Sequence, residues 1–280
     1  EIVNELPKDD PRINFIYKEL EKIENILKLN SSSIKVFRGS YKSTWKSLVN
    51  EYKIKEVFIN EDYEPYAQQR DEWVVSFLDL IDIKVKYYTD HVVFKPGKIK
   101  KEDGFPYTVY TPFKKKWLKH FEKNKPNILP EPNYNNLIKQ TIDFPTLKEL
   151  GFSPSAIKVE AFNISELSNS ELTRDAPSLN ATSYLGPHLR FGTVSIRKII
   201  NQLSPKDHVF LSELIWREFF IQIMFHYPRV ISENFKIKYN GILWRNKEAE
   251  FELWCKGETG YPIVDAGMRQ LNETGYMHNR

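Results

Sequence analysis

Apolar residues recur every three or four positions over residues 11–29, which predicts an amphipathic helix. Asp9 or Asp10 is expected to cap this helix, and Pro11 suits its first turn. Short β-branched runs at 34–37, 54–59 and 83–88 alternate with helical patterns at 41–52 and 67–80. This alternation predicts a parallel sheet packed against helices, a Rossmann-like α/β domain over residues 1–120.

Prolines interrupt the regular patterns after this domain, so residues 121–172 are expected to form a connector wrapped over the surface. Strand-like alternation is scarce in residues 173–280, whereas helical patterns cover 193–203, 207–227 and 263–273. The second domain is therefore predicted to be all-helical. Its segment 207–227 is apolar nearly all the way round, which is typical of a helix inside a domain.

Composition narrows the class of protein. A chain of 280 residues with 41% hydrophobic residues can bury the core of one large or two ordinary domains, which excludes a disordered protein. No apolar run approaches the roughly 20 residues of a membrane-spanning helix, so no membrane partner is expected. The single cysteine, Cys255, rules out an internal disulfide and any cysteine-rich metal site. A cytoplasmic monomer without a metal is the expectation.

Positive charge is unevenly distributed along the chain. The formal net charge is +4, but residues 82–125 alone carry +7, and Lys114 to Lys116 form the densest run. A lysine run is most often a solvated face, and it can also contact a polyanion. The sequence leaves both interpretations open.

One stripe of the 207–227 helix carries charge. Glu213, Trp216, Arg217 and Phe220 fall at i, i+3, i+4 and i+7. Because a buried charge costs several kcal/mol unless it is paired, Glu213 and Arg217 either pair with each other or face a polar cavity. The helix alone favours neither.

Two further clusters carry candidate chemistry. Small hydroxyl residues and glycine in 182–192 precede a helix, which suits either an anion cradle or ordinary helix caps. The segment 254–262 turns into the helix 263–272, which ends near Gly275 and is followed by His278, Asn279 and Arg280.

These clusters, in this order, resemble the flavin-binding half of the DNA photolyase and cryptochrome family. The matching segments are Thr182-Ser183-x-Leu185, Phe191-Gly192-Thr193, Glu213 to Phe219, Trp254 to Pro262, Val264 to Leu271 and Thr274 to Arg280. The N-terminal half agrees through Asp10-Pro11-Arg12, Asp62 to Tyr66, Arg70-Asp71 and Tyr107 to Pro112. The resemblance covers essentially the whole chain.

The resemblance implies an α/β antenna domain followed by an all-helical domain that holds FAD. It also implies a light-driven lyase that passes an electron from excited reduced FAD to a cyclobutane pyrimidine dimer in UV-damaged DNA. The resemblance is to class I photolyases, and Trp216 favours a dimer-repairing enzyme over a plant-type photoreceptor. The alternatives are a cryptochrome-like photoreceptor without repair activity and a flavin-free DNA-binding module.

Site residues are carried over from the resemblance by position. The implied cofactor-binding residues are Thr182, Ser183, Tyr184, Leu185, Gly186, Phe210, Glu213, Arg217 and Phe220. Glu213, Trp216 and Asn279 are the implied catalytic residues, and together with Arg174 they are the implied DNA contacts. Trp244 matches the surface end of an electron-transfer chain.

Several positions depart from the family pattern. Ser170 and Phe210 stand where a tyrosine and a tryptophan are common, and Tyr184 and Gly186 replace an arginine and a serine. Tyr66-Ala67 occupies the place of the asparagine and glutamate of folate-binding members, which favours a deazaflavin antenna, or none, over folate.

Length is the largest departure. Both domains are expected to be incomplete, the first lacking its opening strand and the second its closing helices. The resemblance thus predicts that a chain ending at Arg280 is inactive by itself.

Overall fold

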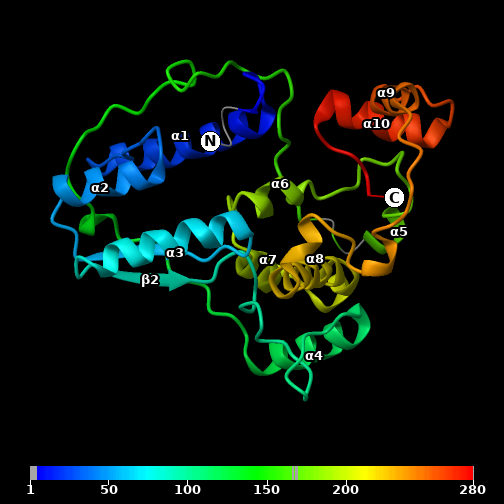
Figure 1. Ribbon diagram of the computed structural model, residues 1–280, viewed down its shortest axis with the longest axis horizontal. Helices are drawn as coiled ribbons and strands as arrows, with labels where there is room; N and C mark the ends of the chain where they lie inside the picture. The colour runs from blue at the N-terminus through cyan, green and yellow to red at the C-terminus, as the bar shows by residue number, and fades with distance from the viewer. Residues whose placement is uncertain (1–4, 166, 168–169, 280) are drawn as a thin grey trace.

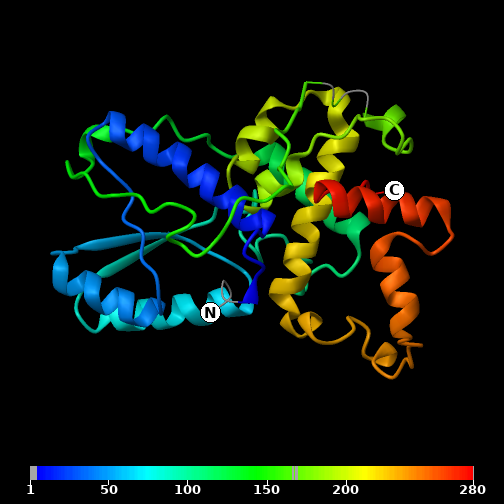
Figure 2. The same cartoon turned by 90° about the horizontal axis from the view of Figure 1, so that it is seen from above.

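The structure, a computed structural model, describes residues 5–165, 167 and 170–279, without the side chains of residues 170 and 171. The chain forms an α/β half and a helical half, which lie side by side along the long axis in both views (Figures 1 and 2). The predicted fold class, an α/β domain with parallel strands joined to a helical domain, is confirmed.

The α/β half contains three helices and a parallel strand pair among the described residues. Its elements are α1 (Pro11–Leu29), α2 (Tyr41–Glu51), β1 (Glu56–Asn60), α3 (Pro65–Asp79) and β2 (Lys84–Tyr88). The strands pair in register from Glu56 opposite Lys84 to Asn60 opposite Tyr88. The capping prediction for α1 is also confirmed, since the Asp10 side chain accepts a hydrogen bond from the Arg12 backbone N–H.

The strand predicted at 34–37 is wrong. This segment has no ladder partner among the described residues, so its backbone forms no strand despite its β-branched side chains.

The helical half is built around one central helix. Its elements are α4 (Tyr110–Lys123), α5 (Ser170–Thr173), α6 (Leu185–Arg190), α7 (Ile196–Gln202), α8 (His208–His226), α9 (Glu248–Lys256) and α10 (Pro262–Thr274). Short 3-10 turns are η2 (Tyr134–Asn136), η4 (Pro205–Asp207), η5 (Pro228–Ile231) and η6 (Ile237–Tyr239). The core packs α4 and the 93–99 segment against α6, α7 and α8, through side chains such as Trp117, Ile199 and Ile215. The sequence boundary at residue 120 therefore falls inside a helix that packs on the helical half.

Residues 124–165 run back over α1, as the green trace in Figures 1 and 2 shows. Their contacts with α1 and the turn after it include an aromatic pair, Tyr17 with Phe144 at 5.6 Å between ring centroids, and several hydrogen bonds. The Asn14 amide donates to the Ser153 carbonyl at 3.0 Å, and Ser33 Oγ donates to the Gln140 carbonyl at 2.8 Å. The proline-rich stretch thus follows the surface of the α/β half.

Candidate functional site

A cavity of about 360 Å³ lies between α6, the first half of α8 and the last described residues of the chain. This size falls within the range of about 300–1,000 Å³ that small-molecule sites occupy. Ten of the sequence-predicted site residues line it: Arg174, Thr182, Ser183, Tyr184, Leu185, Gly186, Phe210, Glu213, Arg217 and Asn279. We call it the helical-domain cavity. Four segments far apart in the sequence meet there.

The 182–186 turn forms one wall of this cavity. Ser183 Oγ accepts from the Leu185 backbone N–H at 3.4 Å, and the Asn163 N–H anchors the turn through the Ser183 carbonyl at 2.9 Å. Tyr184 has a left-handed backbone, with φ of 51°, which is uncommon for a residue other than glycine. Thr182 Oγ1 is buried and has no hydrogen-bond partner among the described residues. A buried hydroxyl of this kind is expected to find its partner in a bound molecule or water.

Glu213 and Arg217 lie on the opposite wall, but they do not pair with each other. Glu213 Oε1 accepts from Arg174 NH2 at 2.8 Å, an ion pair between residues 39 positions apart. Arg217 donates to the His91 carbonyl at 2.6 Å and to the Leu189 carbonyl at 3.2 Å. Burial lowers the pKa of Arg217. The helical i,i+4 pair is therefore absent, and both side chains face the cavity.

Trp216 and Phe220, which share the predicted stripe, lie outside the cavity lining. The Trp216 ring stacks on Tyr110 of α4 with centroids 3.5 Å apart and planes 8° apart. Phe220 stacks on Trp216 at 5.5 Å and is 61% exposed, so part of α8 is open to solvent although the helix is apolar nearly all the way round. Only one side of α8 packs against the core, and polar cavity-lining residues and exposed aromatic residues occupy the rest.

The segment after α10 closes one end of the helical-domain cavity. Tyr276 packs on Tyr184 with ring centroids 5.0 Å apart, and the His278 N–H donates to Gln270 Oε1 at 2.9 Å. Asn279 lines the cavity next to them. Arg280 lies outside the described residues.

Two positions singled out in the sequence lie apart from this arrangement. Trp244 is 71% exposed on the segment between α8 and α9 and does not line the cavity. The side chain of Ser170 lies outside the described residues.

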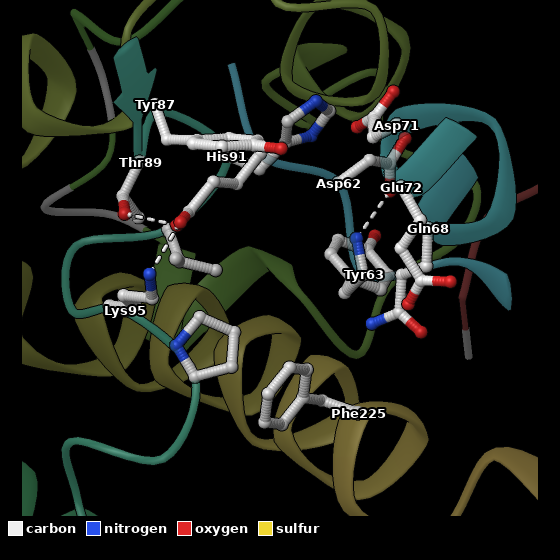
Figure 3. A pocket seen from close by; sticks show the side chains of 13 residues that line it. Asp62, Tyr63, Gln68, Asp71, Glu72, Tyr87, Thr89, His91, Lys95 and Phe225 are labelled. Carbon is white, nitrogen blue, oxygen red and sulfur yellow. Dashed lines mark hydrogen bonds and ion pairs between the residues drawn. The ribbon is translucent and has the colours of Figure 1, made fainter. Parts of the chain in front are cut away.

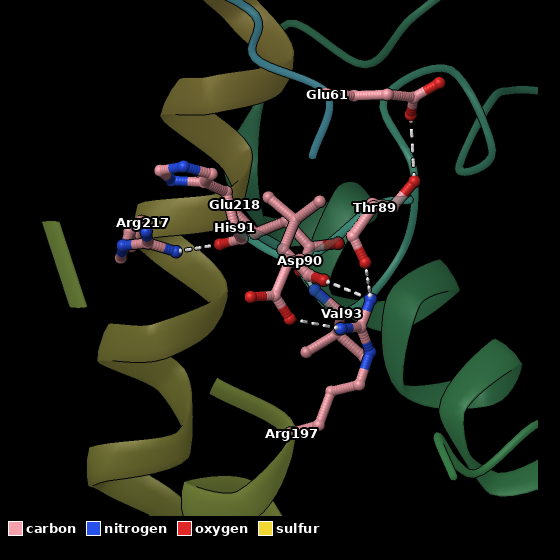
Figure 4. Close-up of polar contacts among 9 residues, drawn as sticks. Glu61, Thr89, Asp90, His91, Val93, Arg197, Arg217 and Glu218 are labelled. Atoms are coloured by element: carbon pink, nitrogen blue, oxygen red, sulfur yellow. Dashed lines mark hydrogen bonds and ion pairs between the residues drawn. The ribbon is translucent and has the colours of Figure 1, made fainter. Parts of the chain in front are cut away.

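A seam of buried polar contacts joins the two halves, and sequence reasoning missed it. Glu218 is 2% exposed and accepts three hydrogen bonds, from Val93 N at 2.9 Å, Phe94 N at 3.3 Å and Trp117 Nε1 at 2.9 Å. Arg197 donates to backbone carbonyls of the same segment (Figure 4). These side chains satisfy an irregular stretch of backbone that enters the core after β2.

Burial shifts the acidity of the carboxyl group in this seam. It raises the pKa of Glu218 to about 7, although the three hydrogen bonds and nearby Arg217 act in the opposite direction. Adjacent residues of α8 therefore have different surroundings: Arg217 lines the helical-domain cavity, and Glu218 bonds to the segment after β2 and to α4.

A second cavity, of about 350 Å³, lies where the carboxyl ends of β1 and β2 meet α3 and α8 (Figure 3). Its lining is rich in carboxylates, from Glu61, Asp62, Asp71 and Glu72, and it includes a single lysine, Lys95. We call it the sheet-edge cavity. Tyr66 and Ala67, singled out in the sequence, lie outside its lining.

Within 5–165, 167 and 170–279, none of the helices combines the length and apolarity that a bilayer-spanning segment requires. The same part of the chain contains no cluster of three or more His, Cys, Asp and Glu side chains that would suit a metal ion.

An α/β half joined to a helical half that contains a ligand-sized cavity defines a two-domain class of protein, and comparisons identify its family. A family model described as DNA photolyase matches residues 4–133, and one described as the FAD binding domain of DNA photolyase matches residues 210–280. The chain belongs to the DNA photolyase/cryptochrome family.

Individual relatives agree with this assignment. The deoxyribodipyrimidine photo-lyase of Halobacterium salinarum is 35% identical over 298 residues, covering 96% of this chain and 62% of that protein. A class III photolyase structure from Agrobacterium tumefaciens has a TM-score of 0.83 at 25% identity, and an archaeal photolyase structure from Sulfolobus tokodaii has 0.77 at 29%. Each structural match covers 98% of this chain and 62% of the other. The chain therefore spans just over three fifths of the length of these relatives, and the class I assignment stays a prediction.

Proposed function

We propose that the protein uses light to repair cyclobutane pyrimidine dimers in DNA, with FAD bound in the helical-domain cavity. The observation that carries this proposal is the cavity itself, which gathers Thr182, Glu213, Arg217 and Asn279 from separate segments. Family membership supports the choice of cofactor, because the matched 210–280 region is an FAD-binding domain.

The residues present fit FAD. The unpartnered Thr182 Oγ1 offers a hydrogen bond to a polar ligand, and Ser183 lines the same wall. Arg217 supplies positive charge for a phosphate, while Phe210 and Leu185 supply apolar surface for flat rings. When bound in its reduced form, FAD supplies an electron after absorbing blue or near-ultraviolet light.

The Arg174–Glu213 pair supplies both a hydrogen-bond donor and an acceptor for a pyrimidine dimer. A carboxylate held by a guanidinium at 2.8 Å accepts hydrogen bonds, so we propose that Glu213 accepts from the ring N–H of a pyrimidine. Arg174 then donates to a carbonyl oxygen of the dimer, where negative charge develops as the ring splits. Asn279 is proposed to contribute a further amide contact from the opposite end.

Trp216 is proposed to flank the flipped dimer. Its stacking on Tyr110 fixes the orientation of the indole before any base arrives, so little side-chain entropy is lost on binding. Trp244, being exposed, is proposed to exchange electrons with reductants in solution.

An antenna chromophore is proposed for the sheet-edge cavity. Glu61 is paired with Lys95 and Asp71 with Arg70, so Asp62 and Glu72 are the carboxylates left to repel the glutamate tail of a folate. A deazaflavin without such a tail avoids this repulsion. The lining thus supports a deazaflavin over a folate.

The test is repair by the protein as its gene encodes it, reduced, mixed with an oligonucleotide that contains one thymine dimer, and illuminated. We expect loss of the dimer in light and none in darkness. Glu213→Ala should lower the yield while flavin absorbance is retained, and Glu131→Ala, an exposed change in the 124–165 segment, is the matched control. Bound flavin without any repair would contradict the proposal and favour a photoreceptor.

A further inference from the structure

Helix α4 presents a face of lysines that the proposed lesion site does not use. With 3.6 residues per turn, Lys115, Lys116, Lys119 and Lys123 fall within an arc of about 100°. Phe113 and Trp117, which are buried, lie on the opposite side of the helix. All four lysines are exposed. We call this surface the α4 lysine face.

The face is electrostatically uncompensated. None of its four lysines forms an ion pair among the described residues. Some lysines elsewhere have carboxylate partners, for example Lys22 with Glu19 at 2.6 Å and Lys86 with Glu56 at 2.9 Å, but most in the described part of the chain do not. What distinguishes this face is therefore the grouping of four lysines on one side of a helix whose one acidic residue is Glu122. An ordinary solvated surface intersperses both signs of charge, so four unpaired lysines on one face favour an external polyanion.

The α4 lysine face is also fixed relative to the helical-domain cavity. Lys114 Nζ donates to Ser212 Oγ at 2.5 Å, and the Tyr110 hydroxyl donates to the Ser212 carbonyl at 2.8 Å. Ser212 directly precedes Glu213 of the cavity wall, and the Trp117 indole N–H anchors the other end of the contact on Glu218. The axis of α4 thus lies roughly 10 Å from that of α8, and the lysine face lies on the side of α4 that points away from α8, one helix width further out.

We infer that the α4 lysine face binds the phosphate backbone of duplex DNA beside the lesion. From Lys115 to Lys123 the helix rises about 12 Å, and a DNA strand carries one charge per about 3.4 Å of helix axis. The face therefore spans three or four phosphates. This inference rests on the proposed function, because it takes DNA as the partner of the neighbouring cavity.

The test is the salt dependence of DNA binding. The triple variant K115Q/K119Q/K123Q is compared with the unmodified protein by fluorescence anisotropy, on labelled duplexes with and without one thymine dimer. Loss of three phosphate contacts should lower the slope of log K against log salt by about 2 to 3, and affinity near 0.1 M salt by up to a few hundred-fold. Both duplexes should be affected equally, because phosphate contacts carry no sequence or lesion information.

The matched control removes the same charge elsewhere. K46Q/K53Q/K55Q changes three exposed lysines on and after α2, and it should leave the slope within about 1 of the unmodified protein. A variant with arginine at positions 115, 119 and 123 should retain the slope. Circular dichroism checks that each variant is folded.

The outcomes separate this inference from the proposed function. Equal slopes for the α4 variant and the control would overturn the inference even if dimers are repaired. A reduced slope without any preference for dimer-containing DNA would uphold the face and contradict the lesion site. Polyglutamate serves as a second probe, a stand-in for an acidic protein. If the α4 variant loses polyglutamate binding but keeps the DNA slope, the partner is an acidic protein and the choice of DNA is overturned.

Discussion

The buried carboxyl group of Glu218 makes the stability of the protein depend on pH near neutrality. Burial raises its pKa from 4.5 to about 7. In the unfolded chain the group ionises near pH 4.5, so between the two values the folded form holds a proton that the unfolded form has lost. The free energy of unfolding therefore falls as the pH rises from 4.5 to 7. Above pH 7 the contribution of Glu218 to it no longer changes with pH.

The size of the effect follows from the shift. One pKa unit corresponds to about 1.4 kcal/mol, so the full loss is about 3 kcal/mol, and about 2 to 3 kcal/mol of it falls between pH 5 and 7.5. Glu218→Gln cannot ionise and should abolish this slope. The amide also turns one acceptor into a donor facing Val93 N or Phe94 N, which adds a pH-independent cost of about 1 to 3 kcal/mol.

The assay is urea unfolding followed by circular dichroism from pH 5 to 7.5. The quantity compared is the free energy of unfolding of the unmodified protein minus that of Glu218→Gln, which cancels groups that titrate in both. Glu122→Gln, an exposed change on α4, is the control and should leave the profile unaltered. A difference that stays constant over the whole range would refute the reasoning, because it would mean that Glu218 does not titrate there.

Three further changes test local parts of the structure by urea unfolding. Gly257→Ala should lower the free energy of unfolding by about 1 to 3 kcal/mol, because φ is +70° and the new Cβ would lie 2.8 Å from the Asp265 carbonyl oxygen. Gly241→Ala is the control, since its Cβ meets open space, and it should be near neutral. Tyr110→Phe keeps the stacked ring but loses the hydrogen bond to the Ser212 carbonyl, for an expected loss of about 1 kcal/mol; no loss would contradict that bond. Asp265→Ala removes three hydrogen bonds to the turn before α10 and should lower the free energy of unfolding at pH 7. Because those bonds lower the Asp265 pKa, this loss should shrink as the pH falls below about 4.

Elements with local determinants could be predicted from the sequence. The bounds of α1 and its Asp10 cap follow from spacing and capping chemistry within a few residues. Helix α4 had an equally local signal, since Tyr110, Phe113, Trp117 and Phe121 recur at three and four positions. This helix is nevertheless absent from the predicted elements, because the lysine run within it is typical of a solvated face and obscures the apolar spacing. Helix α9 was missed as well, although Gly257 marks its end.

Features that depend on long-range contacts could not be predicted. Residues 34–37 have the composition of a strand, but a strand also requires a neighbour that the sequence pattern does not specify. Periodicity placed Glu213 and Arg217 on one face, yet the partner of Glu213 is Arg174, far along the chain. Glu218 is visible in the sequence only as an acidic residue in a largely apolar helix, and its three donors cannot be predicted because they come from other segments.

The central claim is that the cavity of Thr182, Glu213, Arg217 and Asn279 serves light-driven repair of dimers. The most direct measurement is the fraction of thymine dimer restored in a defined oligonucleotide by the reduced protein, in blue light and in darkness. The account predicts restoration in light alone, with a yield that drops several-fold in Glu213→Ala while bound flavin is retained. Flavin-loaded protein that restores no dimer in light, or a Glu213→Ala variant with an undiminished yield, would contradict it.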